Sequence, residues 1–352
     1  HKDLLNGNTK VVYSASDRTL PENYNGLGYM NLIAMIFQIE IIRQRFIGKK
    51  SKRMADINIL LIEEPEAHTH PQMQYVFIKN IKAILEKGIT KDGVTRKYQT
   101  IISTHSSHIV AESNFDDIKY LLRKGDECAV QAKNLKDLKT LYDGENKKYF
   151  AFLKQYLTIN RSELFFADKA IFIEGDTERI LMPAFMKKID DETPADKLGG
   201  KLPLLSQNIS IIEVGAYSQV FAKFINFIGL KKAVVFTDLD IAVNANGPSC
   251  EYNADEVQFT TNSSLKYYFG KEKTISDYVA LPQDKKFFRW DPTENKWKNE
   301  NVANCNMLIC YETKEDGYQP SSFEDCFISA NPDFIKNNDF QMGFEKLYLQ
   351  GY

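Results

Sequence analysis

Short runs of aliphatic, often β-branched residues alternate with longer stretches whose apolar residues recur at helical spacing. The runs include 57–64 and 98–106 in the first half of the chain and 170–175 and 232–240 in the second. Runs of this kind are typical of strands buried on both faces of a parallel sheet, and strands that alternate with helices form right-handed βαβ units. The sequence therefore predicts an α/β protein built on parallel sheets.

The alternation falls into two series, which predicts two domains. The chain has 352 residues, 43% of them hydrophobic, and this is enough for two cores of ordinary size. A helical connector separates the two series. We expect a first domain at 1–148, the connector at 149–167 and a second domain at 168–345.

Charge and cysteine content narrow the class of protein. The 45 basic and 47 acidic residues nearly cancel, so DNA could be bound only through a local basic surface or through bound metal. The five cysteines form no C-x-x-C pair, which favours reduced thiols. No apolar stretch approaches the roughly 20 residues that span a bilayer. We therefore expect a cytoplasmic protein without membrane partners.

The first strand of interest is an aliphatic run that ends in two glutamates. Residues 59–62 read ILLI and are followed by Glu63 and Glu64. In an open parallel sheet, functional groups gather at the carboxyl ends of the strands. An aliphatic strand that closes on two acids is the Walker B pattern, in which one acid holds Mg²⁺ and the next orients the water that attacks the γ-phosphate. The next strand ends in STHS, which places His105 at the same edge, where a histidine can sense that phosphate.

Two glycines open the helix upstream of this strand. Gly26 and Gly28 lie in NGLGYMNL, and glycines at a helix start allow close approach to a phosphate. This is not a dinucleotide fingerprint, because Asn31 occupies the third glycine position and no strand leads into it.

A glycine-rich helix start, a strand ending in Glu-Glu-Pro and a strand ending in Thr-His-Ser resemble, in this order, the C-terminal half of ABC-type ATPase heads. By that resemblance, Gly26 and Gly28 are signature glycines that complete the ATP site of the opposite protomer. Glu63 is the Walker B acid, Glu64 the catalytic base and His105 the switch histidine.

Two alternatives remain for this segment. The strand could simply end in solvated charge, or four histidines could form a zinc site at the same edge, namely His68, His70, His105 and His108. The chain also contains no G-x-x-x-x-G-K-[ST] phosphate loop. We therefore expect these residues not to hold ATP by themselves. Because the chain begins at His1 and in mid-pattern, we expect further residues upstream.

A second group of acids follows strands of the second domain. Glu174 ends one strand, and Glu178 lies one helical turn later, over the same spot. Asp238 and Asp240 end another strand in TDLD and share a face while the backbone stays extended. Gly175 would let the first strand turn tightly into its helix.

Carboxylates that converge on one sheet edge repel one another unless cations neutralise them. Oxygen ligands without Cys or His select Mg²⁺ or Mn²⁺. A later segment, SSFEDCF, supplies Glu324 or Asp325 as a further metal ligand. Strands that merely end in acids are the alternative.

A strand ending in E-G with a second Glu one turn on, followed by a strand ending in D-x-D, resembles the TOPRIM domain of topoisomerases, primases and certain nucleases. An ABC-type head followed by TOPRIM resembles the OLD (overcoming lysogenisation defect) family, which includes Gabija-type and retron-associated nucleases. The resemblance spans residues 24 to about 330. The late lysine that such nucleases place after the third acid has no convincing match before Tyr352.

The resemblance implies a metal-dependent DNA endonuclease regulated by an ATPase head, which acts in anti-phage defence. Glu174, Glu178, Asp238, Asp240 and Glu324 would hold two Mg²⁺ or Mn²⁺ ions, and ATP would be the second cofactor. DNA would be the substrate, and the protein would form a homo-oligomer through its heads, with a possible defence partner protein. Two alternatives stay open: attack by a tyrosine, as in topoisomerases, and an ATP-gated DNA-binding or assembly module that does not cut.

Overall fold

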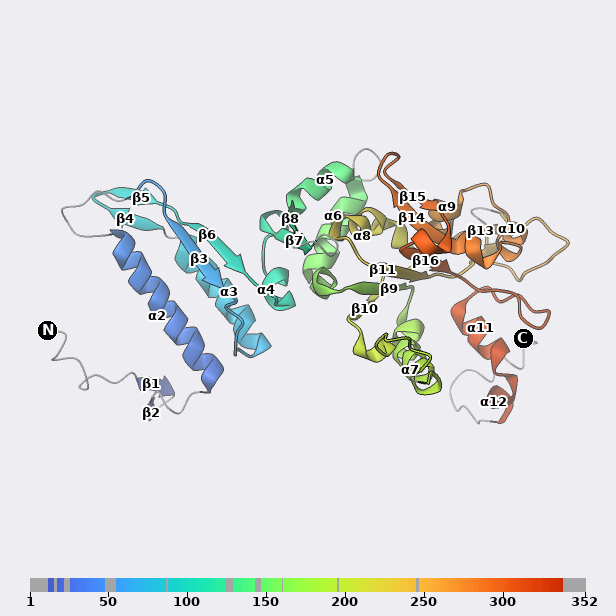
Figure 1. The fold of residues 1–352 in the computed structure, drawn as a ribbon, viewed down its shortest axis with the longest axis horizontal. Coiled ribbons are helices and arrows are strands. Elements are labelled where there is room, and N and C mark those ends of the chain that lie inside the picture. Colours follow the sequence, from blue (N-terminus) through green and yellow to red (C-terminus); the bar gives the residue numbers. More distant parts are fainter. Residues whose placement is uncertain are drawn as a thin grey trace. The chain divides into compact units, whose positions relative to one another are not determined.

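The computed structural model describes residues 12–15, 18–21, 26–47, 55–86, 88–123, 129–142, 147–159, 161–194, 196–244 and 247–337. These residues form two compact units, each with its own core (Figure 1). The first gathers the chain up to residue 119 together with 134–136 and 154–162, and the second gathers the rest. The segment 149–167 contributes residues to both units.

The first unit contains one parallel strand pair and the helices that cover it. Its elements are β1 (Val12–Ala15), β2 (Arg18–Pro21), α2 (Leu27–Ile47), β3 (Ile59–Glu63), α3 (Pro71–Glu86), β4 (Ile89–Lys91), β5 (Val94–Arg96), β6 (Gln99–Ser103), α4 (Ser107–Ala111) and η2 (Phe115–Asp117). β3 pairs with β6 in parallel, with Ile59 opposite Gln99 and Glu63 opposite Ser103. Both predicted strands are confirmed, and their ends lie side by side.

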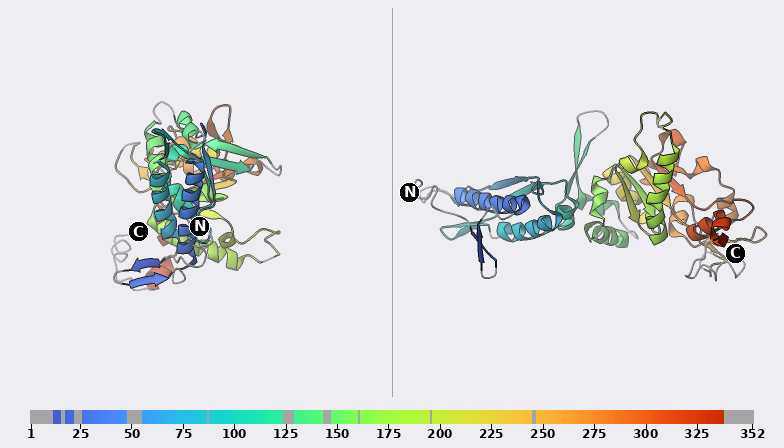
Figure 2. Two further views of the ribbon diagram at one scale, coloured as in Figure 1. Left: turned by 90° about the vertical axis from the view of Figure 1, so that its left-hand side faces the viewer. Right: turned by 90° about the horizontal axis from the view of Figure 1, so that it is seen from below.

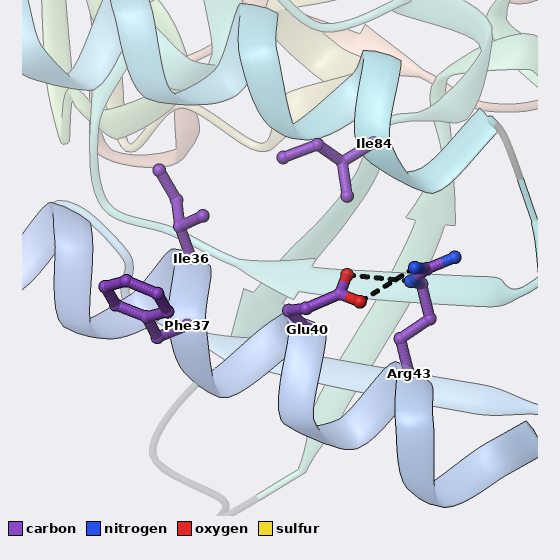
Figure 3. Close-up of a pocket in the computed structure, with 5 residues that line it drawn as sticks. All are labelled: Ile36, Phe37, Glu40, Arg43 and Ile84. Atoms are coloured by element: carbon purple, nitrogen blue, oxygen red, sulfur yellow. Dashed lines mark hydrogen bonds and ion pairs between the residues drawn. The ribbon is translucent and has the colours of Figure 1, made fainter.

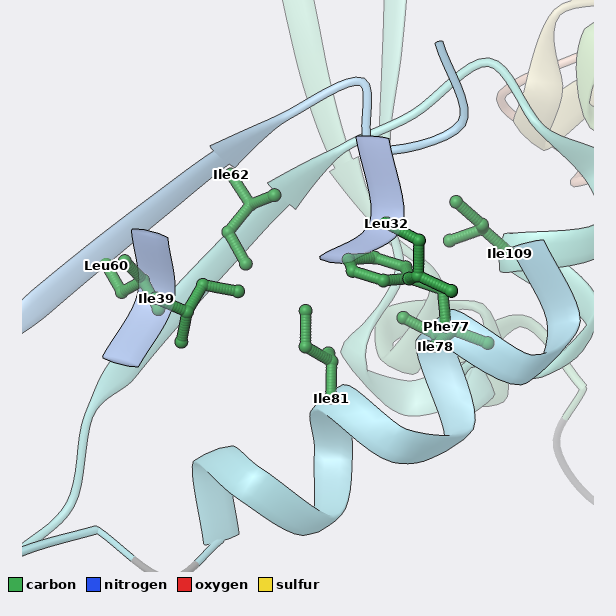
Figure 4. Close-up of a cluster of buried hydrophobic side chains, with 8 residues drawn as sticks. All are labelled: Leu32, Ile39, Leu60, Ile62, Phe77, Ile78, Ile81 and Ile109. Atoms are coloured by element: carbon green, nitrogen blue, oxygen red, sulfur yellow. The ribbon is translucent and has the colours of Figure 1, made fainter. Parts of the chain in front are cut away.

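Helices α2 and α3 pack on one face of the β3–β6 pair (Figure 4). Buried side chains from both helices, from β3 and from α4 form the core, namely Leu32, Ile39, Leu60, Ile62, Phe77, Ile78, Ile81 and Ile109. The opposite face of the sheet is exposed: Leu61 retains 71% of its accessible surface, Ile101 52% and Ile59 50%. The expectation that these strands are buried on both faces is therefore wrong for the described residues, because both helices cover the same side.

The second unit is organised around a six-stranded sheet. Its strands are β9 (Lys169–Ile173), β10 (Ile209–Glu213), β11 (Lys232–Phe236), β14 (Phe287–Asp291), β15 (Lys296–Asn299) and β16 (Met307–Cys310), in the order β10-β9-β11-β16-β14-β15. The first four strands in this order run parallel, and β14 is antiparallel to both its neighbours. The predicted α/β class with parallel strands is confirmed.

Helices cover both faces of this sheet (Figures 1 and 2). α7 (Asp176–Glu192) packs through Met182 and Met186 against Ile173. On the other face, the ring of Phe172 lies 5.8 Å from that of Phe221, at the start of α8 (Ala222–Ile228). Because β9, α7, β10, α8 and β11 follow one another in the chain, they form two consecutive βαβ units, as predicted.

The remaining elements include those around the sheet and those in residues 119–166, a stretch that supplies residues to both units. They are β7 (Lys119–Arg123), β8 (Val130–Asn134), η3 (Leu135–Asp137), α5 (Leu138–Leu141), α6 (Lys147–Ile159), η5 (Ser162–Phe166), η6 (Leu204–Ser206), η7 (Ser218–Val220), β12 (Ile241–Ala242), β13 (Phe259–Thr260), α9 (Ser263–Phe269), α10 (Ile275–Val279), η8 (Gln283–Lys286), η9 (Val302–Asn304), α11 (Phe323–Ala330) and α12 (Pro332–Asn337). None of the described helices has the length and apolarity needed to cross a membrane.

Candidate functional site

The predicted Walker B segment and the predicted switch histidine meet at the ends of β3 and β6. Glu64 directly follows β3, and its N–H donates to the Ser103 carbonyl at 3.0 Å. Its φ of 40° lies in the left-handed region, which is uncommon for a residue other than glycine. His105 Nε2 lies 3.2 Å from Glu64 Oε1. The strand register thus brings Glu64 and His105 into direct contact, and Glu63, the last residue of β3, is exposed beside them.

Glu66, which was not predicted, links the loop after β3 to the loop after β6. Glu66 Oε1 accepts a hydrogen bond from the His105 backbone N–H at 2.6 Å. Its second carboxylate oxygen is buried and has no hydrogen-bond partner among the described residues. Glu66 therefore fixes the backbone that carries the histidine.

The two predicted signature glycines differ in their surroundings. A Cβ at Gly28 would lie 3.1 Å from the His68 carbonyl oxygen and 3.3 Å from the Thr69 Cα. A Cβ at Gly26 would meet nothing within 4 Å, and Gly26 is exposed. Gly28 thus allows the first turn of α2 to approach the loop after β3, whereas Gly26 leaves open space.

The zinc alternative receives no support from the described residues. His105 is paired with Glu64, and His70 Nδ1 accepts from the Gln72 N–H at 3.3 Å. Across the described ranges, no three His, Cys, Asp or Glu side chains stand close enough together to hold a metal ion.

A cavity of about 270 Å³ lies beside α2 and α3 (Figure 3), and none of the residues described above lines it. It is lined by Ile36, Phe37, Glu40, Arg43 and Ile84. Arg43 forms hydrogen bonds of 2.7 Å to both carboxylate oxygens of Glu40 and lowers the pKa of that carboxyl to about 2. Because the charges of this pair satisfy each other, the cavity offers no free charge for a ligand.

The second set of predicted acids gathers beyond the ends of β9 and β11. Glu174 follows β9, and its Oε1 accepts three hydrogen bonds. The donors are the Asp238 N–H at 3.0 Å, Asn262 Nδ2 at 2.8 Å and the Thr237 hydroxyl. Glu174 therefore fixes the start of the Asp-Leu-Asp segment through its backbone.

The Asp-Leu-Asp segment is no longer a strand. β11 ends at Phe236, and Asp240 has a φ of 47°, so the two aspartates do not share the face of an extended strand as predicted. The Leu239 N–H donates to Glu312 Oε2 at 2.9 Å, and the Asp240 N–H donates to the Ser321 carbonyl at 3.2 Å. These contacts still hold both aspartates near Glu174.

Burial and mutual repulsion make these carboxyls resist ionisation. Burial and then the neighbouring Glu312 raise the pKa of Asp238 from 3.8 to about 10. Burial also raises the pKa of Glu312 to about 7 and shifts the pKa of Asp240 upward, where the charge of Glu174 adds to it. Without a cation, the native site therefore retains protons that exposed acids would release.

Glu178 and Glu324 lie at the start of α7 and α11. Glu178 is 4% exposed, its Oε2 accepts from the Gly175 N–H at 3.0 Å, and burial raises its pKa. Glu324 is exposed, and its Oε1 accepts from the Thr177 hydroxyl at 2.6 Å. The chain passes from β9 into α7 within two residues, as predicted, but Gly175 has a φ of −146°, an extended conformation open to any residue, so the turn does not require glycine there.

The chemistry of this donor set fits a hard divalent cation. The ligand groups are carboxylates, with no cysteine or histidine among the predicted ligands. Burial, and after it repulsion between neighbouring acids, raises the pKa values of Glu178, Asp238 and Asp240, and a bound cation would favour their charged forms. As stated above, their oxygens do not form a closed coordination group among the described residues.

Three members of this site were not predicted. Glu312 lies two residues beyond the end of β16, so the strand-end argument applied to MLICYE would have found it. Thr237 immediately precedes Asp238 in the chain. It belongs to the site because its hydroxyl donates to Glu174 Oε1, a direction that the sequence does not give. Asn262 lies more than twenty residues from the nearest predicted acid, in a polar segment without a motif, and only the fold reveals it.

Two family models match the chain. Residues 1–110 match the AAA ATPase domain, and residues 165–240 match the TOPRIM domain of overcoming lysogenization defect protein-like proteins. Glu174, Glu178, Asp238 and Asp240 fall inside the second match, and Glu324 lies outside it.

Curated relatives span the whole chain or large parts of it. Endonuclease GajA of Bacillus cereus (strain HuB5-5) is 29% identical over 364 residues, which cover 100% of this chain and 47% of the relative. The OLD nuclease of Thermus scotoductus is 27% identical over 53% of this chain and 32% of its own length. The Old nuclease of Escherichia phage P2 is 22% identical over 68% of this chain and 37% of its own length. The chain thus spans about half or less of the length of these relatives.

Proposed function

Because this chain belongs to the OLD family, with an AAA ATPase domain followed by a TOPRIM domain, we propose that it cuts DNA by phosphodiester hydrolysis under the control of its ATPase domain. The observation that carries the proposal is the cluster of Glu174, Asp238 and Asp240, which a hydrogen-bond network holds beyond the ends of two parallel strands.

Divalent cations bound by these carboxylates would activate water and stabilise the leaving oxygen. Glu174 would present Oε2 to the reaction, because Oε1 already accepts three hydrogen bonds. Asp238 and Asp240 would supply the other ligand oxygens, with Glu178 and Glu324 at the margin of the site. Glu312 would hold the backbone between the two aspartates through the Leu239 N–H.

The ATPase domain would act through Glu64 and His105. Glu64 would orient the water that attacks the γ-phosphate, and His105, 3.2 Å away, would link the occupancy of the phosphate site to the loop that follows β6. Glu63 would hold Mg²⁺, and Gly26 and Gly28 would complete the ATP site of a second protomer. This part of the proposal rests on the family resemblance and on the contact between Glu64 and His105.

We place this activity in cytoplasmic defence against phage DNA, carried out by a homo-oligomer paired through its ATPase domains, with a possible partner protein. The resemblance to defence nucleases supports this setting.

Plasmid cleavage tests the proposal. The full-length protein should nick or linearise plasmid DNA with Mg²⁺ or Mn²⁺, ATP should change the rate, and EDTA should stop the reaction. Asp238→Ala should abolish cleavage, whereas Asp255→Asn, at an exposed position, should not. Cleavage by a folded Asp238→Ala protein at the parental rate would refute the assignment. DNA binding without cleavage by the parent would favour a binding or assembly module instead.

A further inference from the structure

We infer that Asn262 is a positioning residue that holds Glu174 and Asp240 at a fixed separation for the cleavage reaction, an inference that rests on the proposed nuclease function. Its Nδ2 donates to Glu174 Oε1 at 2.8 Å and to Asp240 Oδ2 at 3.2 Å. One side-chain amide thus links an acid beyond β9 to an acid beyond β11. It comes from a third segment, the start of α9, and is 1% exposed.

The other end of this amide is fixed by the helix. Asn262 is the N-cap of α9, and its Oδ1 accepts from the Ser264 N–H at 2.9 Å and the Leu265 N–H at 3.1 Å. These bonds satisfy backbone donors that the first turn of a helix leaves unpaired. Because Oδ1 must face these donors, Nδ2 has to face the acids. The helix cap therefore sets the direction of the amide without relying on the acids.

A neutral donor suits this position better than a cation would. Lysine or arginine would pair with the acids and compete with a divalent ion for the same oxygens. The amide binds one oxygen of each carboxylate and adds no charge, so the remaining oxygens stay available for the metal. Residues that hold metal ligands in place typically contribute about 10–100-fold to metal affinity or activity.

Asn262→Ser separates the two roles of the residue. Serine is a good N-cap, so α9 should keep its cap, but a serine hydroxyl is too short to reach both acids. The matched control is Asn301→Ser, the same change at the exposed N-cap of η9, where Asn301 Oδ1 accepts from the Ala303 N–H. Asn262→Asp serves as a second variant, because it keeps the shape and the cap but turns the donor into an acceptor.

Two measurements in the full-length protein decide the inference. Plasmid cleavage kinetics should show kcat reduced about 10–100-fold in Asn262→Ser, with KM for DNA unchanged. Mn²⁺ titration by calorimetry, without DNA, should show weaker binding. Asn301→Ser should match the parent in both measurements, and the two serine variants should melt near the parental temperature.

The outcomes separate the inference from the proposed function. If the parent cleaves DNA and Asn262→Ser keeps its kcat and Mn²⁺ affinity, the positioning role is wrong and the nuclease stands. If the parent does not cleave DNA, the proposed function fails, and the Mn²⁺ titration alone judges whether Asn262 organises the acids. If Asn262→Ser does not fold, Asn262→Asp decides: unchanged kcat and Mn²⁺ affinity in that variant refute the inference.

Discussion

Replacing Asp238 by asparagine should stabilise the metal-free protein while it removes DNA cleavage. Asparagine keeps the shape of the side chain, and its Oδ1 can still accept from the Phe323 N–H, which lies 3.1 Å from Asp238 Oδ1. Its new N–H₂ group can donate to Glu312, whose proximity helps to raise the pKa of Asp238. The variant therefore removes a buried charge conflict without opening a cavity.

The sign of the pH dependence follows from the raised pKa. In the native protein the pKa of Asp238 rises from 3.8 to about 10, so between these values the folded state holds a proton that the unfolded chain releases. Stability contributed by the protonated form is present below about pH 4 and is lost as pH rises toward about 10, by up to ~1.4 kcal/mol per pH unit. Asparagine has no proton to lose, so its advantage should grow with pH.

The magnitude at pH 8 follows from the same shift. Four pH units above the ordinary value correspond to roughly 6 kcal/mol as an upper bound. Because Asp238 shares its proton with Glu312, and because asparagine must also be desolvated, we expect about half, roughly 3 kcal/mol at pH 8 and roughly 1 kcal/mol at pH 5. For a unit of this size, the melting temperature should rise by roughly 6–12 °C at pH 8.

Thermal unfolding in EDTA from pH 5 to pH 9 measures the effect, with Asp255→Asn as the exposed control that should change nothing. Saturating Mn²⁺ should reverse the order, because the cation binds and stabilises the native parent. An Asp238→Asn protein that melts at or below the parental temperature at pH 8, or whose advantage does not change with pH, would refute the reasoning.

Three further predictions concern both domains. Glu64→Gln should slow ATP hydrolysis by about 10² or more while ATP still binds, because it removes the residue that orients water; an ATPase rate equal to the parent's would contradict the Walker B assignment. Gly28→Ala should lower stability by about 1–3 kcal/mol in urea unfolding, because its Cβ would crowd the His68 carbonyl, whereas Gly26→Ala should be neutral to stability; equal effects would contradict the packing argument. Glu312→Ala should lower kcat for DNA cleavage, because the Leu239 N–H loses its acceptor, and Glu312→Gln should restore part of it; no difference between the two variants would argue against this role.

The two-domain α/β architecture could be predicted because its signals are local. Aliphatic runs at 57–64 and 170–175 and helical spacing between the runs define strands and helices within short windows. The ends of parallel strands then bring Glu64 to His105 and Glu174 to Asp238, so both pairs followed from strand-end reasoning alone.

Other parts of the fold depend on contacts between residues that lie far apart in the sequence. The segment after residue 241 looks merely polar, yet it forms the β14–β15 hairpin, in which Trp290 and Trp297 lie opposite each other with ring centroids 5.5 Å apart. The same segment contributes Asn262, whose role depends on a helix start that meets acids from two distant strands. Exposure of the β3–β6 face was missed for a similar reason, since an apolar run does not say whether one face or both are covered.

The backbone conformation of Asp240 limits which residues can replace it during evolution. Its backbone lies in the left-handed region, where asparagine and glycine are the residues with the least strain. Both should keep the fold, and neither would bring the charge that the proposed metal binding needs. In a lineage released from the need to cut DNA, drift should therefore reach asparagine or glycine at this position early. A relative with either residue here should still fold and still bind ATP, and should have lost the ability to cleave DNA.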